Sequence, residues 1–270
     1  LFFREEKKWQ KYLALILGIF SLFGIVMSGT KGTFLGLLTG IGVALLLSLI
    51  TFWKNQRVRV PLIAIMGIGA ILLTSLFMFR STIFVSRLPF IGGIANLNLH
   101  SGTGETRMMA WKIGVEAWKD YPFFGWGPNN YYYAFNLYYK PQSLLFGYGE
   151  TWFDNAHNVV VNTLNVQGLF GLFTYVLLFS ATIVILWRGR KKWLGGAVPS
   201  LIIIGFLSAH FVHNVSVFEN PTSYLYFFFL LAFVNNTFVK ENGVENLKTK
   251  NRTEKKLASW NYVLIGSVVV

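Results

Sequence analysis

Three basic side chains have the chemistry of a site that handles phosphate. Arg107 carries a planar guanidinium, which binds phosphate through paired hydrogen bonds and always stays charged. Lys31 lies between two glycines, whose small size lets a ligand approach the backbone closely. His157 follows Asp154, and an imidazole near a carboxylate is the usual arrangement of a general base. These residue types together indicate phosphate binding combined with general-base chemistry.

Each of the three also has a purely structural explanation. Arg107 would anchor an interfacial helix to lipid headgroups, and Lys31 would end a helix by extending its ammonium towards water. His157 would hydrogen-bond the backbone at a helix end. Three further residues are secondary candidates: His213, Glu105 and Glu219. An ionisable residue within a membrane segment is a functional candidate by default, although His213 would equally serve to bond a neighbouring helix.

The sequence contains no pattern typical of a cofactor or metal site. Walker, Rossmann and Gly-x-Ser-x-Gly motifs are absent, and the His, Asp and Glu residues lack metal-ligand spacing. The chain has no cysteine, which excludes disulfides, thiol nucleophiles and thiolate ligands. We therefore expect no cofactor and no metal, so isolated cationic side chains would have to hold any phosphate.

The composition is that of a membrane protein. Hydrophobic residues make up 54% of the 270 positions, charged residues only 13%, and the mean hydropathy is +0.50. The net charge of +13 would suggest nucleic acid in a soluble protein. Here the basic residues cluster between apolar spans, which points to membrane topology and to the lipid bilayer as partner, with no nucleic acid.

The apolar spans predict an all-α, polytopic transmembrane bundle of six or seven spans. The predicted segments are three spans in residues 1–79, a long loop in 80–157, three spans in 158–239, a cytoplasmic polar segment in 240–260 that we expect to be flexible, and a further span beginning at 261. The chain starts without Met and stops inside an apolar run, so we expect residues to be missing at both ends. The glycine-interrupted stretches 36–42 and 67–69 are either broken helices or ordinary membrane helices.

Positive charge assigns the two sides of the bundle. One set of alternating connections carries most of the 24 Lys and Arg residues, although the other set contains the much longer loop 80–157. Cytoplasmic connections are the ones enriched in Lys and Arg. We therefore expect the 80–157 loop to lie outside the cytoplasmic membrane, together with Lys31, His157, His213 and Glu219.

The loop itself is predicted to contain a helix from Gly104 to Asp120, stopped by Pro122. Glu105 falls in its first turn, where the helix dipole favours an acid. Its predicted apolar stripe consists of Met108, Trp111, Val115 and Trp118. Such a helix would lie along the membrane surface. The loop is also rich in aromatic residues that would either stack on sugar rings or, as we expect, join the interfacial belt: Tyr131–Tyr133, Tyr138, Tyr139 and Trp152.

Three stretches are similar to motifs of one family. They are Met27–Gly36 at the end of a span, Thr106-Arg107 followed by Trp111 and Tyr121–Gly127, and Ala156-His157-Asn158 followed by Gly168–Gly171. Their order, and the long loop that contains them, resemble the C-terminal half of the bacterial O-antigen ligase and Wzy-type O-antigen polymerase superfamily. The likeness covers most of the chain from Tyr12 to Val239.

The resemblance implies a metal-independent, multi-pass glycosyltransferase of the membrane-embedded C class in the bacterial cytoplasmic (inner) membrane. Its donor would be a polyprenyl-pyrophosphate-linked glycan, and its acceptor a hydroxyl of a glycan, lipid or protein. Arg107 would bind the pyrophosphate and stabilise the leaving group, and His157 would deprotonate or orient the acceptor. Lys31 stands where the family usually has Arg; it keeps the charge and loses the bidentate fork.

Two readings from other classes remain open. A transporter or flippase of a lipid-linked or anionic substrate would use several spans, but charges inside the spans are scarce here. A membrane scaffold would use the loop to bind a partner. An assay in reconstituted vesicles distinguishes the first rival from a transferase. A transporter moves substrate across the bilayer, whereas a transferase makes a new glycosidic bond. Unchanged function after replacing both Arg107 and His157 would favour the second.

Overall fold

The computed structural model describes residues 8–83, 85, 103–192 and 196–247, and all regular elements in these ranges are helical. The long helices are α1 (Lys8–Ser28), α2 (Lys31–Thr51), α3 (Gln56–Met78), α8 (Val159–Gly189), α9 (Ala197–Val215) and α10 (Pro221–Leu247). Five of them, α2, α3, α8, α9 and α10, are long and apolar enough to cross a membrane. The prediction of an all-α polytopic membrane protein is confirmed.

Two predictions at the C-terminal end have different outcomes. Helix α10 continues past Val239 to Leu247, so the polar segment expected to be flexible is helical over its first residues. The span predicted from residue 261 lies outside the described residues.

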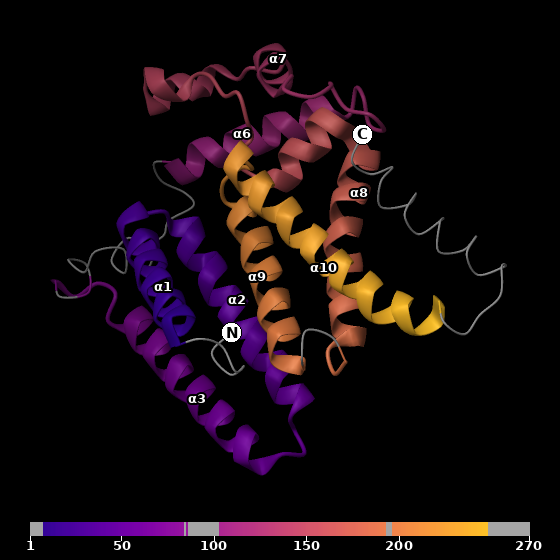
Figure 1. The fold of residues 1–270 in the computed structure, drawn as a ribbon. Coiled ribbons are helices and arrows are strands. Elements are labelled where there is room, and N and C mark those ends of the chain that lie inside the picture. The colour runs from indigo at the N-terminus through magenta and orange to yellow at the C-terminus, as the bar shows by residue number, and fades with distance from the viewer. Residues whose placement is uncertain (1–7, 84, 86–102, 193–195, 248–270) are drawn as a thin grey trace.

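The long helices alternate in direction, which places the starts of α2 and α8 and the end of α9 at the same end of the bundle (Figure 1). Helix α6 (Thr103–Trp118) crosses this end, and α7 (Tyr131–Leu137) lies above α6 in the same view. Two 3-10 turns follow, Pro141–Phe146 and Tyr148–Glu150. We call residues 103–158 the cap layer.

The cap layer has a hydrophobic core of its own, separate from that of the bundle. The cap core consists of Ala110, Ile113, Tyr131, Phe135, Phe153, Ala156 and Val166. The bundle core, between α8, α9 and α10, consists of Phe179, Leu186, Ile204, Leu207, Phe227 and Val234. The long connection is therefore a packed layer, which can hold side chains at fixed positions.

Tyr131 belongs to this cap core, so the expectation of a sugar-stacking or interfacial role is wrong for it. Its side chain is buried, and its hydroxyl donates a hydrogen bond of 2.7 Å to the carbonyl oxygen of Ala110. Burial raises the pKa of the Tyr131 hydroxyl far above its ordinary value.

The helix predicted from Gly104 to Asp120 is confirmed as α6, but the face that it buries is different. The buried positions are Thr106, Ala110, Ile113, Gly114 and Ala117. The predicted stripe is only partly covered, and its Val115 is exposed. Small residues let α6 approach the start of α8 closely, where Asn165 donates a hydrogen bond of 2.9 Å to the carbonyl oxygen of Gly114. The packed face therefore combines the burial of Ile113 in the cap core with the close backbone approach that the small residues allow.

Helix α8 is broken at Gly168, whose φ of 67° is not helical. The loop after α6 supplies hydrogen bonds to the polar backbone groups that the break exposes. Trp126 and Gly127 donate to the carbonyl oxygens of Asn165 and Val166, both over 2.9 Å, and Leu169 donates to that of Pro122 over 2.9 Å. Backbone groups at membrane depth need such partners. The break therefore fastens the cap layer to the spanning part of α8.

Helices α2 and α9 make the most extensive helix–helix contact in the described part of the chain. A Cβ added to Gly36 would lie 2.6 Å from the carbonyl oxygen of Ala209, and one added to Gly40 would lie 2.6 Å from that of Gly205. Glycines four residues apart let two membrane helices touch backbone to backbone. The stretch 36–42 is therefore a continuous packing helix, not a broken one.

This contact predicts a difference between two glycines of the same helix. Gly40→Ala places a methyl group against the backbone of α9 and should lower the free energy of unfolding by about 1–3 kcal/mol. Gly42→Ala meets nothing within 4 Å and should be neutral or slightly stabilising. Thermal unfolding of both variants in the same detergent measures the difference, and equal Tm values would contradict the packing described here.

Candidate active site

Four segments distant in sequence meet at the end of the bundle that α6 crosses. They are the start of α2, the first turn of α6, the residues just before α8, and the turn of residues 216–220 between α9 and α10. The turn 216–220 makes the contacts that join them. All candidate side chains except Glu105 contact this turn or lie next to a residue that does.

Arg107 projects from the first turn of α6 towards the turn 216–220. Its Nη1 donates a hydrogen bond of 2.9 Å to the carbonyl oxygen of Ser216, and the side chain is half-buried. Within the described part of the chain this is the one hydrogen bond of the guanidinium, and it occupies one of its five N–H groups. Arg107 is therefore held in place and keeps donors for a second partner.

Lys31 is the first residue of α2 and is exposed. The next residue, Gly32, packs against Ser216, since a Cβ added to Gly32 would lie 2.8 Å from the Cβ of Ser216. Arg107 thus contacts Ser216 directly, and Lys31, 76 positions earlier in the chain, directly precedes the glycine that packs against Ser216. The start of α2 adds the positive end of a helix dipole and unpaired N–H groups. The start of α2, with Lys31, and the first part of α6, with Arg107, therefore both bring positive charge to the end of the bundle where Ser216 lies.

His157 has a backbone conformation that is rare for a residue with a side chain. Its φ is 51°, in the left-handed region, and its backbone N–H donates to Oδ1 of Asn155 over 2.9 Å. The imidazole contacts the rings of Phe153 and Phe218 edge to face, with centroids 5.8 and 5.2 Å apart. Phe218 belongs to the turn 216–220, so His157 is fixed against the same turn as Arg107. Strained backbone of this kind clusters at functional sites.

The hydrogen bond of the His157 ring defines its neutral tautomer. Nδ1 lies 3.2 Å from the carbonyl oxygen of Asn155, and a carbonyl oxygen can only accept. Nδ1 therefore carries the hydrogen, and Nε2 keeps a lone pair that can take a proton. The sequence suggested Asp154 as the group that orients the ring. Asp154 is exposed, and the backbone of Asn155 orients the ring in its place.

The side chains of His213 and Glu105 make different contacts from those of Lys31, Arg107 and His157. His213, in the last turn of α9, shares a hydrogen bond of 3.3 Å between its Nδ1 and Oγ1 of Thr33, which ties α9 to the start of α2. Glu105 lies in the first turn of α6, as predicted, and is exposed. It lines a hollow of 360 Å³ with Lys112 and Lys140, on the face of α6 that points away from the bundle core.

Glu219 is the centre of a buried polar cluster that joins three helices. Its Oε1 accepts hydrogen bonds from Tyr175 of α8 (3.3 Å) and Asn214 of α9 (2.6 Å), and lies 3.1 Å from Nε2 of His210. Its Oε2 accepts from Ser223 of α10 over 2.6 Å, and its side chain is only 3% exposed. The cluster fixes the turn 216–220 to α8, α9 and α10, so Glu219 has a structural role here.

The surroundings of Glu219 have opposing effects on the pKa of its carboxyl group. Burial alone would raise the pKa of Glu219, but the hydrogen bonds from His210 and Ser223 outweigh burial and hold the pKa below its ordinary value of 4.5. The carboxyl is therefore ionised at neutral pH. Within the described part of the chain, no group of three or more His, Asp or Glu side chains is placed to hold a metal ion.

The sequence interpretation missed the residues that connect the site. Ser216 and Phe218 contribute a carbonyl oxygen and a ring, and neither residue type signals such a role. His210 and Asn214 carry a weak signal, because two polar residues four positions apart inside an apolar span usually face a polar partner. Glu219, five residues after Asn214, is that partner.

Comparison with known proteins identifies the family of the chain. A family model described as O-antigen ligase matches residues 16–176, which is more than half of the chain. The matched region contains α2, the whole cap layer, the break in α8, and the residues Lys31, Arg107 and His157. A search of curated proteins found no match.

The cluster around Glu219 predicts a pH-dependent contribution to stability. Glu219→Gln keeps the size of the side chain but places an amide N–H among hydrogen-bond donors, which should cost about 3 kcal/mol of unfolding free energy at pH 7. Because the pKa is lowered, the contribution is fully present above pH 4.5 and is lost as the pH falls through the lowered pKa.

Tm values of wild type and Glu219→Gln in detergent, from pH 7 downwards, measure this contribution. The difference between them should stay constant down to pH 4.5 and shrink below it. Glu105→Gln, which alters an exposed carboxylate, is the control and should change the Tm little at any of these pH values. A difference for Glu219→Gln that is as small as that of the control would disprove the structural role.

Proposed function

Since the chain belongs to the O-antigen ligase family, we propose that it transfers a glycan from a polyprenyl-pyrophosphate donor to an acceptor hydroxyl at the outer face of the bacterial cytoplasmic membrane. The family gives the class of reaction, glycan transfer by a multi-pass membrane protein. The donor, the outward orientation and the roles of individual residues are our proposal.

One observation carries the proposal. Arg107 and His157, from two distant segments, each contact the turn 216–220, and Lys31 directly precedes Gly32, which packs against the same turn. A pyrophosphate needs fixed positive charge, and an acceptor hydroxyl needs a base close to it. A membrane anchor or scaffold would need neither the convergence nor the rare backbone conformation of His157.

The reaction balances with these groups alone. The acceptor oxygen attacks the anomeric carbon of the donor, and its proton passes to Nε2 of His157. A new glycosidic bond forms while the bond between the anomeric carbon and the pyrophosphate oxygen breaks. Negative charge grows on the pyrophosphate, where Arg107, Lys31 and the start of α2 stabilise it. Fixed cations thus supply the electrostatic stabilisation, and the scheme uses no metal ion in any step.

The charge distribution supports the orientation. The ends of the long helices opposite the cap layer are followed by basic connections, including Lys54 to Arg59 and Arg188 to Lys192. Such connections usually stay in the cytoplasm, which supports an outward orientation of the cap layer. The acceptor is a hydroxyl of a glycan, a lipid such as lipid A core, or a protein, and both ligase and polymerase reactions fit the same three residues.

Transfer assays on site variants test this proposal. His157→Ala should lower the rate of glycan transfer by about 10²–10⁴ because the proton acceptor is lost. Arg107→Lys should lower it by about 10²–10³ because a guanidinium fork is replaced by a point charge. Lys31→Arg keeps the charge and should retain activity, whereas Lys31→Ala should not. The assay uses membranes supplied with the lipid-linked donor.

Two controls separate chemistry from folding. Lys112→Ala removes an exposed cation from the same helix as Arg107 and should leave transfer unchanged. Membrane levels and Tm values of all variants should match those of wild type, with a modest decrease allowed for Arg107, whose bond to Ser216 is structural. Normal transfer by His157→Ala and Arg107→Lys would refute the assigned roles, and transport of substrate without new glycosidic bonds would refute the proposed function itself.

A further inference from the structure

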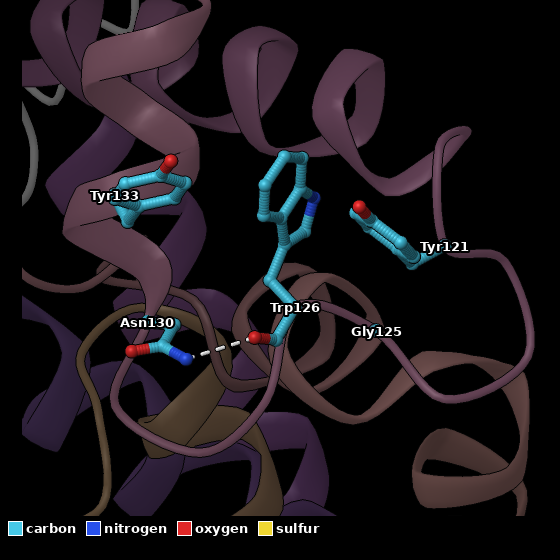
Figure 2. A pocket seen from close by; sticks show the side chains of 5 residues that line it. All are labelled: Tyr121, Gly125, Trp126, Asn130 and Tyr133. Atoms are coloured by element: carbon cyan, nitrogen blue, oxygen red, sulfur yellow. Dashed lines mark hydrogen bonds between the residues drawn. The ribbon is translucent and has the colours of Figure 1, made fainter.

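A hollow of 370 Å³ lies at the far end of α6 from Arg107 (Figure 2). Five residues from the loop after α6 and from the region of α7 line it: Tyr121, Gly125, Trp126, Asn130 and Tyr133. Figure 2 shows Trp126 in the middle, with Tyr121 on one side and Tyr133 on the other. None of the lining residues is charged, and the proposed reaction does not use any of them.

Trp126 is held rigidly from three directions. Its Nε1–H donates a hydrogen bond of 2.8 Å to the carbonyl oxygen of Ala117, and its backbone N–H donates one of 2.9 Å to that of Asn165. The ring of Tyr121 meets it edge to face, with centroids 4.7 Å apart. A rigid aromatic surface loses little conformational entropy when a ligand binds.

Polar atoms without partners surround this aromatic surface. Asn130 donates through Nδ2 to the carbonyl oxygen of Trp126 over 2.9 Å, which fixes the amide. Its Oδ1 forms no hydrogen bond within the described part of the chain, and neither do the hydroxyls of Tyr121 and Tyr133. Both tyrosine side chains belong to residues that are more than half exposed, 52% and 57%. The hollow thus offers aromatic faces together with neutral donors and acceptors.

This combination fits a neutral sugar ring. A pyranose has an apolar C–H face that packs on an aromatic ring, and hydroxyls at its edge that pair with amide and phenol groups. A phosphate or a carboxylate would find no cation here. We propose that the hollow is a distal glycan subsite, which holds a neutral sugar unit several units away from the reacting one. The inference rests on the proposed function.

The length of α6 sets the separation between the two sites. Arg107 lies in its first turn and Ala117, which fixes Trp126, lies in its last, so the rise between them is about 15 Å. A sugar attached to a pyrophosphate near Arg107 cannot fill the hollow, whereas a later unit of the same chain can. The subsite therefore acts on long glycans and not on short ones.

Two neighbouring tyrosines give a matched test. Tyr133 lines the hollow, whereas Tyr132, 42% exposed, contacts Trp152 and does not line it. Transfer kinetics are measured with donors that carry one sugar unit or many, and separately with short and long acceptors. Tyr133→Ala should lower kcat/KM about five- to tenfold for the long donor or the long acceptor, through KM, and not for the short ones. Tyr132→Ala should leave all of these unchanged.

The kinetics with long donors and those with long acceptors together show whether the donor glycan or the acceptor glycan occupies the subsite. An equal loss for short and long substrates in both arms, or no loss at all, would overturn the proposal. An equal loss would instead indicate that Tyr133 supports the fold or anchors the cap layer to lipid headgroups. Tyr133→Phe, which keeps the ring, should retain most of the preference for long glycans.

A binding measurement separates this inference from the proposed function. The oligosaccharide that mild acid releases from the donor lipid carries no pyrophosphate, and its binding to the detergent-solubilised protein is measured by calorimetry. Wild type and Tyr132→Ala should bind it, and Tyr133→Ala should bind it about five- to tenfold more weakly. Binding without any transfer would refute the proposed function and keep the subsite, whereas transfer with identical binding by all three proteins would refute the subsite alone.

Discussion

The backbone contact between α2 and α9 is the constraint on which the rest of the site depends. Gly36 and Gly40 let the two helices touch, and this contact fixes their relative register. The same register brings Gly32, the residue after Lys31, against Ser216, whose carbonyl oxygen holds Arg107. A larger residue at any of these glycines would shift the start of α2 relative to the residue that holds Arg107.

A second constraint acts through backbone polarity. The break at Gly168 exposes N–H and C=O groups of α8, and the loop of residues 122–127 pairs with them. Gly125 fits because a side chain there would collide with the backbone of Asn165. Two of the three stretches that resemble the family motifs thus contact each other directly. They work as a clamp between the cap layer and a spanning helix, while catalytic roles fall to Arg107 and His157 in the proposal.

The sequence predicted the spans, the position of α6 and the gathering of Lys31, Arg107 and His157 at one end, because hydropathy and alternation determine these features. It could not predict which face of α6 is buried. Hydrophobic periodicity favoured the larger side chains such as Trp111, whereas close packing selected small ones such as Ala110. The hydrogen-bond partners of His157 and Glu219 could not be predicted either. A backbone carbonyl oxygen or a residue on another helix produces no recognisable pattern in the sequence.

A lysine at position 31, where the resemblance to the family implies an arginine, has a physical explanation if pyrophosphate lies where we propose. Arg107 spends one N–H on Ser216 and gains a fixed orientation, so it supplies the directional contact. Lys31 forms no such bond within the described chain, yet it stands at the first residue of α2, where backbone N–H groups already offer directed donors. A compact ammonium then needs only to add charge, which Lys provides as well as Arg. The bidentate fork that Lys31 lacks is replaced by the helix on which it stands.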